Sequence, residues 1–132
     1  MRRIILVAVI LSMAGPAAAF NLDNRLRVTS DGGTDFTVNY RLGARITDYW
    51  CAAGRYALRE LGQPRKTRVY RLSPPPQRKG EGIRFTLDPA RSSGSTGLSI
   101  FGGAQDGSIS AGVASASNCY DVNIRRRGSD AD

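Results

Sequence analysis

The alternation of apolar and polar residues along the chain predicts a protein rich in strands. Three segments alternate with the period of two that is typical of a strand with one buried face: Phe36–Leu42, Ile83–Leu87 and Tyr120–Ile124. Two stretches with a weaker pattern, Leu26–Thr29 and Lys66–Leu72, predict further strands. Turn-forming residues separate these segments, so we expect them to pair as antiparallel neighbours.

The segment Phe36–Leu42 has the clearest strand pattern. Its apolar residues, all at even-numbered positions, are Phe36, Val38, Tyr40 and Leu42. This spacing predicts that all four lie on one face of a strand. The preceding residues 30–35, SDGGTD, are typical of a tight turn. The strand is therefore expected to form a hairpin with the stretch before it.

One segment has a helical period instead. Its apolar face consists of Ile46, Trp50, Ala53, Gly54, Ala57, Leu58 and Leu61. Thr47 or Asp48 is the predicted N-cap, and Gly62 with Pro64 marks the end of the helix. Because Gly54 lies on the apolar face, we expect it to allow a strand to approach closely. Trp50 is expected to pack in the core, with stacking against a ligand as the alternative.

Two later segments have unusual compositions. Residues 73–82, SPPPQRKGEG, predict a stiff polar connection between strands, with a recognition segment for an aromatic groove as the alternative. Residues 92–117 consist mainly of Gly, Ser and Ala. Within them, Leu98–Phe101 and Ile109–Val113 flank GGAQDG and predict a hairpin with a glycine-rich turn, and a flexible binding loop is the alternative.

Together these elements predict an α+β fold, in which one amphipathic helix packs on an antiparallel sheet of about five to six strands. The domain is expected to span residues 20–132, and residues 128–132 are expected to form a frayed tail. A chain of this length can bury a single modest core.

The first 19 residues have the layout of a secretory signal peptide. Arg2 and Arg3 precede the apolar run Ile4–Leu11, and Ala17–Ala19 resembles a cleavage site. A membrane anchor is the alternative, but that run of eight residues is shorter than the roughly 20 that a spanning helix needs. We therefore expect cleavage after Ala19, a periplasmic or secreted location, and no transmembrane segment in the mature chain.

The two cysteines, Cys51 and Cys119, are predicted to form a disulfide after export to an oxidising compartment. In the alternative, Cys51 is a reactive thiol, because the first turn of a helix lowers the pKa of a cysteine. The chain contains neither a C-x-x-C motif nor a histidine. The absence of histidine argues against Ser-His-Asp and Cys-His catalysis and against a zinc site. We predict no metal, no cofactor and no assignable catalytic residue.

The charge of the chain suggests a class of partner. Removal of Arg2 and Arg3 with the leader lowers the net charge from +8 to +6, and arginine supplies nearly all of the positive charge. The candidate anion-binding residues are Arg55, Arg59, Arg125, Arg126 and Arg127. They would bind lipopolysaccharide, anionic lipid or nucleic acid. In the alternative interpretation, the arginines reflect a GC-rich genome and only maintain solubility.

The stretches DYWCAAGRYA, RVYRLSPPP and GIRFTLDPA resemble a group of small exported proteins from GC-rich Gram-negative bacteria. That resemblance implies export and no particular activity. We therefore expect a non-enzymatic binding domain or an envelope-associated domain, whose partner is an envelope protein or an anionic envelope polymer. The alternatives are a polyanion-binding protein with an arginine-rich surface and a small carboxylate-dependent hydrolase.

Overall fold

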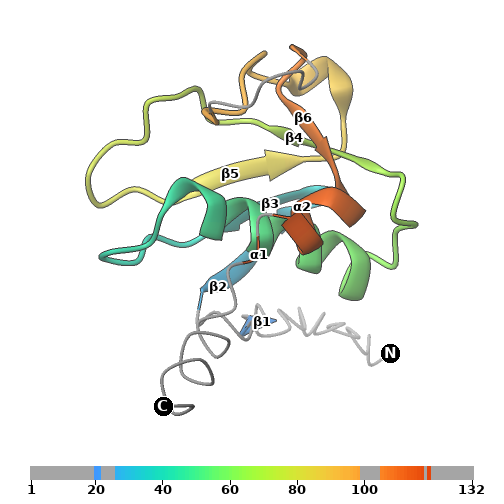
Figure 1. The fold of residues 1–132 in the computed structure, drawn as a ribbon, viewed down its shortest axis with the longest axis horizontal. Coiled ribbons are helices and arrows are strands. Elements are labelled where there is room, and N and C mark those ends of the chain that lie inside the picture. The colour runs from blue at the N-terminus through green and yellow to red at the C-terminus, as the bar shows by residue number, and fades with distance from the viewer. Residues whose placement is uncertain (1–19, 22–25, 99–104, 118, 120–132) are drawn as a thin grey trace, which may run out of the picture.

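The computed structural model describes residues 20–21, 26–98, 105–117 and 119. The strands are β1 (Phe20–Asn21), β2 (Arg27–Gly32), β3 (Asp35–Val38), β4 (Arg68–Arg71), β5 (Ile83–Thr86) and β6 (Ser108–Ser110). The helices are α1 (Ile46–Arg59), the single 3-10 turn η1 (Pro89–Arg91) and α2 (Ala111–Ser117). Figure 1 shows the arrangement of these elements.

The strands form one antiparallel sheet in the order β1-β2-β3-β5-β4-β6. In the centre of the sheet, Phe36 of β3 pairs with Phe85 of β5, and Val38 pairs with Ile83. Because paired residues lie on the same face, these four apolar side chains form one patch. The predicted α+β class, with a helix on an antiparallel sheet of about this size, is confirmed.

The core lies between this apolar patch and α1. Trp50 of α1 is fully buried, and its ring meets that of Phe85 edge-on with a centroid separation of 4.9 Å. The ring of Tyr56, almost two turns further along α1, lies 4.6 Å from that of Phe36. Trp50 is therefore a core residue, as predicted. The opposite face of the sheet carries polar residues such as Thr37 and Arg84, which pair across β3 and β5.

A second helix lies where the sequence predicted a strand. The apolar stretch Ile109–Val113 is divided between β6, which ends at Ser110, and α2, which begins at Ala111. The strand prediction is therefore wrong beyond Ser110. The strand β6 pairs with β4, and most of its predicted hairpin partner, Leu98–Phe101, lies outside the described residues. Figure 1 shows α2 beside α1.

Gly54 explains why the two helices fit together. A Cβ atom on Gly54 would lie 2.7 Å from the backbone nitrogen of Ser115 and 2.8 Å from the Cβ of Ala114. No side chain fits into that space. Gly54 therefore permits a close approach, as predicted, but the element that approaches is α2 and not a strand.

The start of α1 also differs from the prediction. The N-cap is Arg45, and Asp48 is the third residue of the helix. The Asp48 carboxylate accepts a hydrogen bond of 2.8 Å from the backbone nitrogen of Arg45. Asp48 thus accepts a hydrogen bond from a backbone N–H group that has no partner within the helix. It lies in the first turn, where a negative charge interacts favourably with the helix dipole.

The predicted disulfide between Cys51 and Cys119 is present. Cys51 is 1% exposed, and Cys119 follows α2, so the bond joins α1 to the chain just beyond the second helix. The two sulfur atoms are bonded to each other, so Cys51 is not a free thiol in this structure. The predicted leader 1–19, the strand Tyr120–Ile124 and the tail 128–132 lie outside the described residues.

Neither helix in the described part of the chain combines the length and apolar character of a membrane-spanning helix.

Candidate functional site

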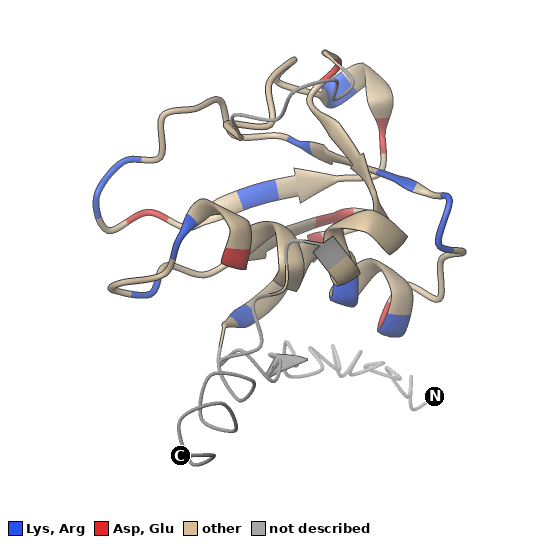
Figure 2. Ribbon diagram, in the orientation of Figure 1, with Lys and Arg blue, Asp and Glu red and all other residues tan. Residues whose placement is uncertain are grey.

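The predicted anion-binding arginines are only partly described by the structure. Arg55 and Arg59 lie one turn apart on α1, so they share a face of that helix. Arg55 is half-buried and Arg59 is exposed. The predicted triplet of Arg125, Arg126 and Arg127 lies outside the described residues, so its proximity to α1 stays a prediction. Figure 2 shows that lysines and arginines also occupy both ends of the molecule and the sheet, so the positive charge is not confined to α1.

Two loops that are far apart in the sequence lie at the same end of the sheet. Residues 39–45 join β3 to α1, and residues 72–82 join β4 to β5. They lie side by side because Val38, the last residue of β3, pairs with Ile83, the first residue of β5. We call residues 39–45 and 72–82 the basic loop end.

Close packing fixes the base of this loop end. A Cβ atom on Gly82 would lie 3.2 Å from the Cα of Asn39 and 3.2 Å from Cγ2 of Thr37. The two chain segments are thus in contact where they leave the sheet. The backbone nitrogen of Asn39 also donates a 2.8 Å hydrogen bond to the carbonyl of Arg27 on β2. The loops therefore start from a well-packed platform.

The basic loop end carries a concentration of positive charge. Arg41 and Arg45 lie on the first loop, and Arg78 and Lys79 lie on the second. All four are exposed. Glu81 is the one acidic residue of the two loops, so their formal charge is +3. Arg45 also forms an ion pair with Asp48 of α1, with 3.6 Å between Nε and Oδ2. Arg41, Arg78 and Lys79 therefore carry most of the positive charge that a partner would meet. Figure 2 shows both loops at the left-hand end of the molecule.

Two exposed apolar side chains accompany these cations. Leu42 is 82% exposed and Tyr40 is 38% exposed. The prediction that both lie on the buried face of a strand is therefore wrong. The strand β3 ends at Val38, where β5 begins, and the chain then turns at residues 41–44. Gly43 has a φ of +82° in this turn. A glycine next to an alternating segment is the feature of the sequence that indicates such a turn.

The polar face of the sheet holds two groups of paired charges. Asp31 accepts a hydrogen bond from Thr37 and lies 3.8 Å from Arg84. Asp35 accepts a 2.7 Å hydrogen bond from Thr86 and forms an ion pair with Arg91. The hydrogen bond from Thr86 is the largest cause that holds the pKa of Asp35 below its usual value, although partial burial opposes this effect.

Asp106 is a second carboxyl with a lowered pKa. Its side chain accepts hydrogen bonds from the hydroxyl of Ser108 at 2.6 Å and from the backbone nitrogen of Ser108 at 3.1 Å, and the hydroxyl bond is the largest cause. Asp88 accepts a 2.9 Å bond from the nitrogen of Ala90 at the start of η1. Both residues therefore act in turns. A lowered pKa is the reverse of what a general acid at neutral pH requires.

Arg71 is the one buried arginine among the described residues, with 1% exposure. Its Nε donates a 2.7 Å hydrogen bond to the carbonyl of Ser73, and its Nη1 donates a 3.2 Å bond to the carbonyl of Thr96. The Thr96 carbonyl also accepts a 3.0 Å bond from Nε1 of Trp50. Burial lowers the pKa of Arg71. This side chain joins β4 to the loop at residues 93–98 and is not available to a partner.

The described residues contain no group of three or more potential metal ligands among Asp, Glu and Cys, and the full sequence contains no histidine. The basic loop end, which combines exposed cations with two exposed apolar side chains, is the candidate site.

No protein-family profile, curated protein or solved structure matches this chain. The resemblance to small exported proteins noted in the sequence stays a prediction.

Proposed function

We propose that this chain is an exported, non-enzymatic domain that binds an anionic component of the cell envelope through the basic loop end. The observation that carries the proposal is the placement of four exposed cations on two adjacent loops with a formal charge of +3. Arginine and lysine attract phosphate and carboxylate groups, and clustered charges of one sign strengthen that attraction. Hydrogen bonds from Thr86 and Ser108 hold the pKa values of Asp35 and Asp106 low, so neither carboxyl is suited to be the general acid of the hydrolase alternative.

Export is part of the same proposal. Residues 1–19 would act as a signal peptide that is cleaved after Ala19, and the Cys51–Cys119 disulfide is typical of proteins from oxidising compartments. Intact-mass measurement of protein purified from the periplasm or the medium tests this step. We expect a chain that begins at Phe20 and has no free thiol. A chain that retains residues 1–19, or one with two free thiols, would refute it.

Retention on immobilised heparin tests the binding step. Because anion binding releases counterions, we expect retention of the purified protein above physiological salt and a steep decrease in affinity as salt rises. Elution below physiological salt would contradict the proposal.

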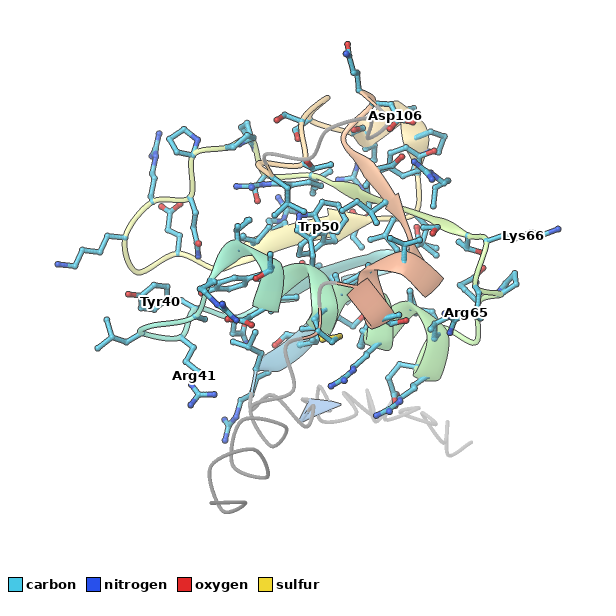
Figure 3. All side chains as sticks on the ribbon, viewed as in Figure 1. Tyr40, Arg41, Trp50, Arg65, Lys66 and Asp106 are labelled. Carbon is cyan, nitrogen blue, oxygen red and sulfur yellow. A yellow bond between two sulfur atoms is a disulfide. The ribbon has the colours of Figure 1, made fainter. Side chains whose placement is uncertain are left out.

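The two lysines of the mature chain provide a matched pair of variants. Lys79 lies in the basic loop end, and Figure 3 shows Lys66 at the opposite end of the molecule, away from Tyr40 and Arg41. Lys79→Glu and Lys66→Glu change the net charge by the same amount, and both positions are exposed. We expect Lys79→Glu to elute at clearly lower salt than Lys66→Glu. Equal elution of the two variants would show that only net charge matters.

The double variant Arg55→Glu/Arg59→Glu tests the surface that the sequence predicted. If α1 is the binding surface, this variant loses retention while Lys79→Glu keeps it. Our proposal predicts that, for each charge reversed, Lys79→Glu lowers the salt concentration of elution more than the double variant does.

A further inference from the structure

The basic loop end contains exposed apolar residues as well as cations. Heparin has no apolar surface that could bury these residues. Leu42, Tyr40 and Val113 are the exposed large apolar side chains in the described part of the chain, and two of the three lie on the same loop, two positions apart. Single exposed apolar residues are common on protein surfaces. The unusual feature is that Leu42, at 82% exposure, stands at the tip of a loop that also carries Arg41 and Arg45.

The turn that presents Leu42 is held in place. The backbone nitrogen of Ala44 donates a 3.1 Å hydrogen bond to the carbonyl of Arg41, which places Leu42 and Gly43 at the two central positions. Gly43 supplies the positive φ that a type II turn requires at the second of these positions. Because the backbone of the turn is already ordered, burial of Leu42 by a partner costs little additional backbone entropy.

The loop is also braced against α1. The backbone nitrogen of Arg41 donates a 3.2 Å hydrogen bond to the hydroxyl of Tyr49, whose side chain is fully buried in the core. The Leu42 turn is thus connected to the core one residue before its tip. Figure 3 shows Tyr40 and Arg41 at the same end of the molecule.

We propose that the basic loop end docks on the surface of an anionic phospholipid bilayer, with Leu42 entering the boundary between headgroups and acyl chains. Tyr40 lies at headgroup depth, where its ring and hydroxyl both find suitable surroundings. Arg41, Arg78 and Lys79 contact the headgroup phosphates. This inference rests on the proposed function and identifies the anionic component as lipid.

Three arguments favour a bilayer over other partners. A soluble polyanion offers no apolar phase for Leu42. The buried centre of a stable protein–protein interface is built from several apolar and aromatic side chains, and this loop end offers only Leu42 and Tyr40. A bilayer, in contrast, needs only a small inserted apolar surface together with several cations near anionic lipids.

The expected affinity has two contributions. Each lysine or arginine near an anionic leaflet strengthens binding by about fivefold at physiological salt. Burial of the Leu42 side chain contributes about tenfold or more. Binding should therefore be weak and reversible, and it should depend both on anionic lipid and on Leu42.

The first experiment uses tryptophan as a depth reporter. Leu42→Trp and the control Val113→Trp are mixed with vesicles of phosphatidylglycerol and phosphatidylethanolamine, and the emission of the buried Trp50 is subtracted with the wild-type protein. We expect Leu42→Trp to shift to the blue and to be quenched by brominated acyl chains, while Val113→Trp is unchanged. Emission of Leu42→Trp that neither shifts nor is quenched would overturn the proposal.

The second experiment measures partition into the same vesicles and retention on heparin. We expect Leu42→Ser to lower the vesicle partition coefficient about tenfold and to leave heparin retention unchanged. Val113→Ser should change neither. Vesicle binding by Leu42→Ser at the wild-type level would overturn the bilayer proposal, and heparin retention would then still support the proposed function. If the wild-type protein bound neither heparin nor vesicles, both proposals would be wrong.

Discussion

At the scale of single residues, Asp35 connects three segments of the polar face. It lies at the start of β3, accepts a hydrogen bond from Thr86 on β5, and pairs with Arg91 on η1. These contacts stabilise the ionised carboxylate, which is why its pKa is lowered in the folded chain.

The lowered pKa of Asp35 predicts a pH dependence of stability. Because the folded pKa lies below the unfolded value of about 3.9, the stabilisation is fully present above that value and is lost as the pH falls through the folded pKa. We expect Asp35→Asn to lower the free energy of unfolding by about 1–2 kcal/mol at pH 7, with a smaller difference from wild type at pH 2–3. Urea unfolding at both pH values measures this.

Asp31→Asn is the matched control for Asp35→Asn. Asp31 is more exposed, and its ion pair with Arg84 is looser, at 3.8 Å. An exposed pair of this kind contributes about 0.5 kcal/mol or less. If the two variants lost the same stability at pH 7, the role assigned to Asp35 would be wrong.

Single residues also show how far the sequence alone could lead. The core position of Trp50 followed from the helical pattern of its neighbours. Tyr40 and Leu42 were assigned to the core because alternation reports which side chains share a face and does not report where the partner strand ends. The strand β3 ends where its partner β5 begins, and β5 lies more than 40 positions away in the sequence. The basic loop end could not be predicted for the same reason.

At the scale of elements, the predicted helix is present, and so are the two weakly patterned strands at Leu26–Thr29 and Lys66–Leu72, which correspond to β2 and β4. The strands around Phe36 and Phe85 and the helix that carries Trp50 have clear periods and are present. The helix α2 was missed because its residues 111–117, AGVASAS, contain mostly small side chains with no strong hydrophobic period. It forms because Ala111 and Ala114 are buried against α1, and this tertiary contact overrides local propensity.

The contact between α1 and α2 gives a prediction for Gly54. Replacement of a helical glycine by alanine normally stabilises a helix by up to about 1 kcal/mol. At Gly54 the new methyl group would press against the backbone of α2 at Ala111 and Ser115. Overpacking of this kind costs about 1–3 kcal/mol, so we expect Gly54→Ala to lower the melting temperature. A higher melting temperature than wild type would show that the helices separate easily.

At the scale of the whole molecule, the disulfide joins parts of the chain that are far apart in sequence. Cys51 and Cys119 are separated by 68 positions, so the bond closes a loop that contains most of α1, three of the strands and α2. In the chain-entropy account, a cross-link over a loop of this length stabilises the fold by about 4 kcal/mol. That is a large share of the total stability of a small domain.

We therefore expect the double variant Cys51→Ala/Cys119→Ala to lose about 2–5 kcal/mol of unfolding free energy. Urea unfolding of the variant and of the wild type under non-reducing conditions measures this. Wild-type protein treated with a reducing agent should lose a similar amount. A variant as stable as the oxidised wild type would mean that the core is sufficient to hold the fold without the cross-link.

The location of the anion-binding surface is the central claim, and chemical-shift mapping tests it most directly. Backbone amide spectra of the isotope-labelled protein would be recorded during titration with a heparin-derived oligosaccharide. The account predicts that the largest shifts fall at residues 39–45 and 77–82, with small changes around Arg55 and Arg59. Largest shifts on α1, or small shifts spread evenly over the surface, would contradict it.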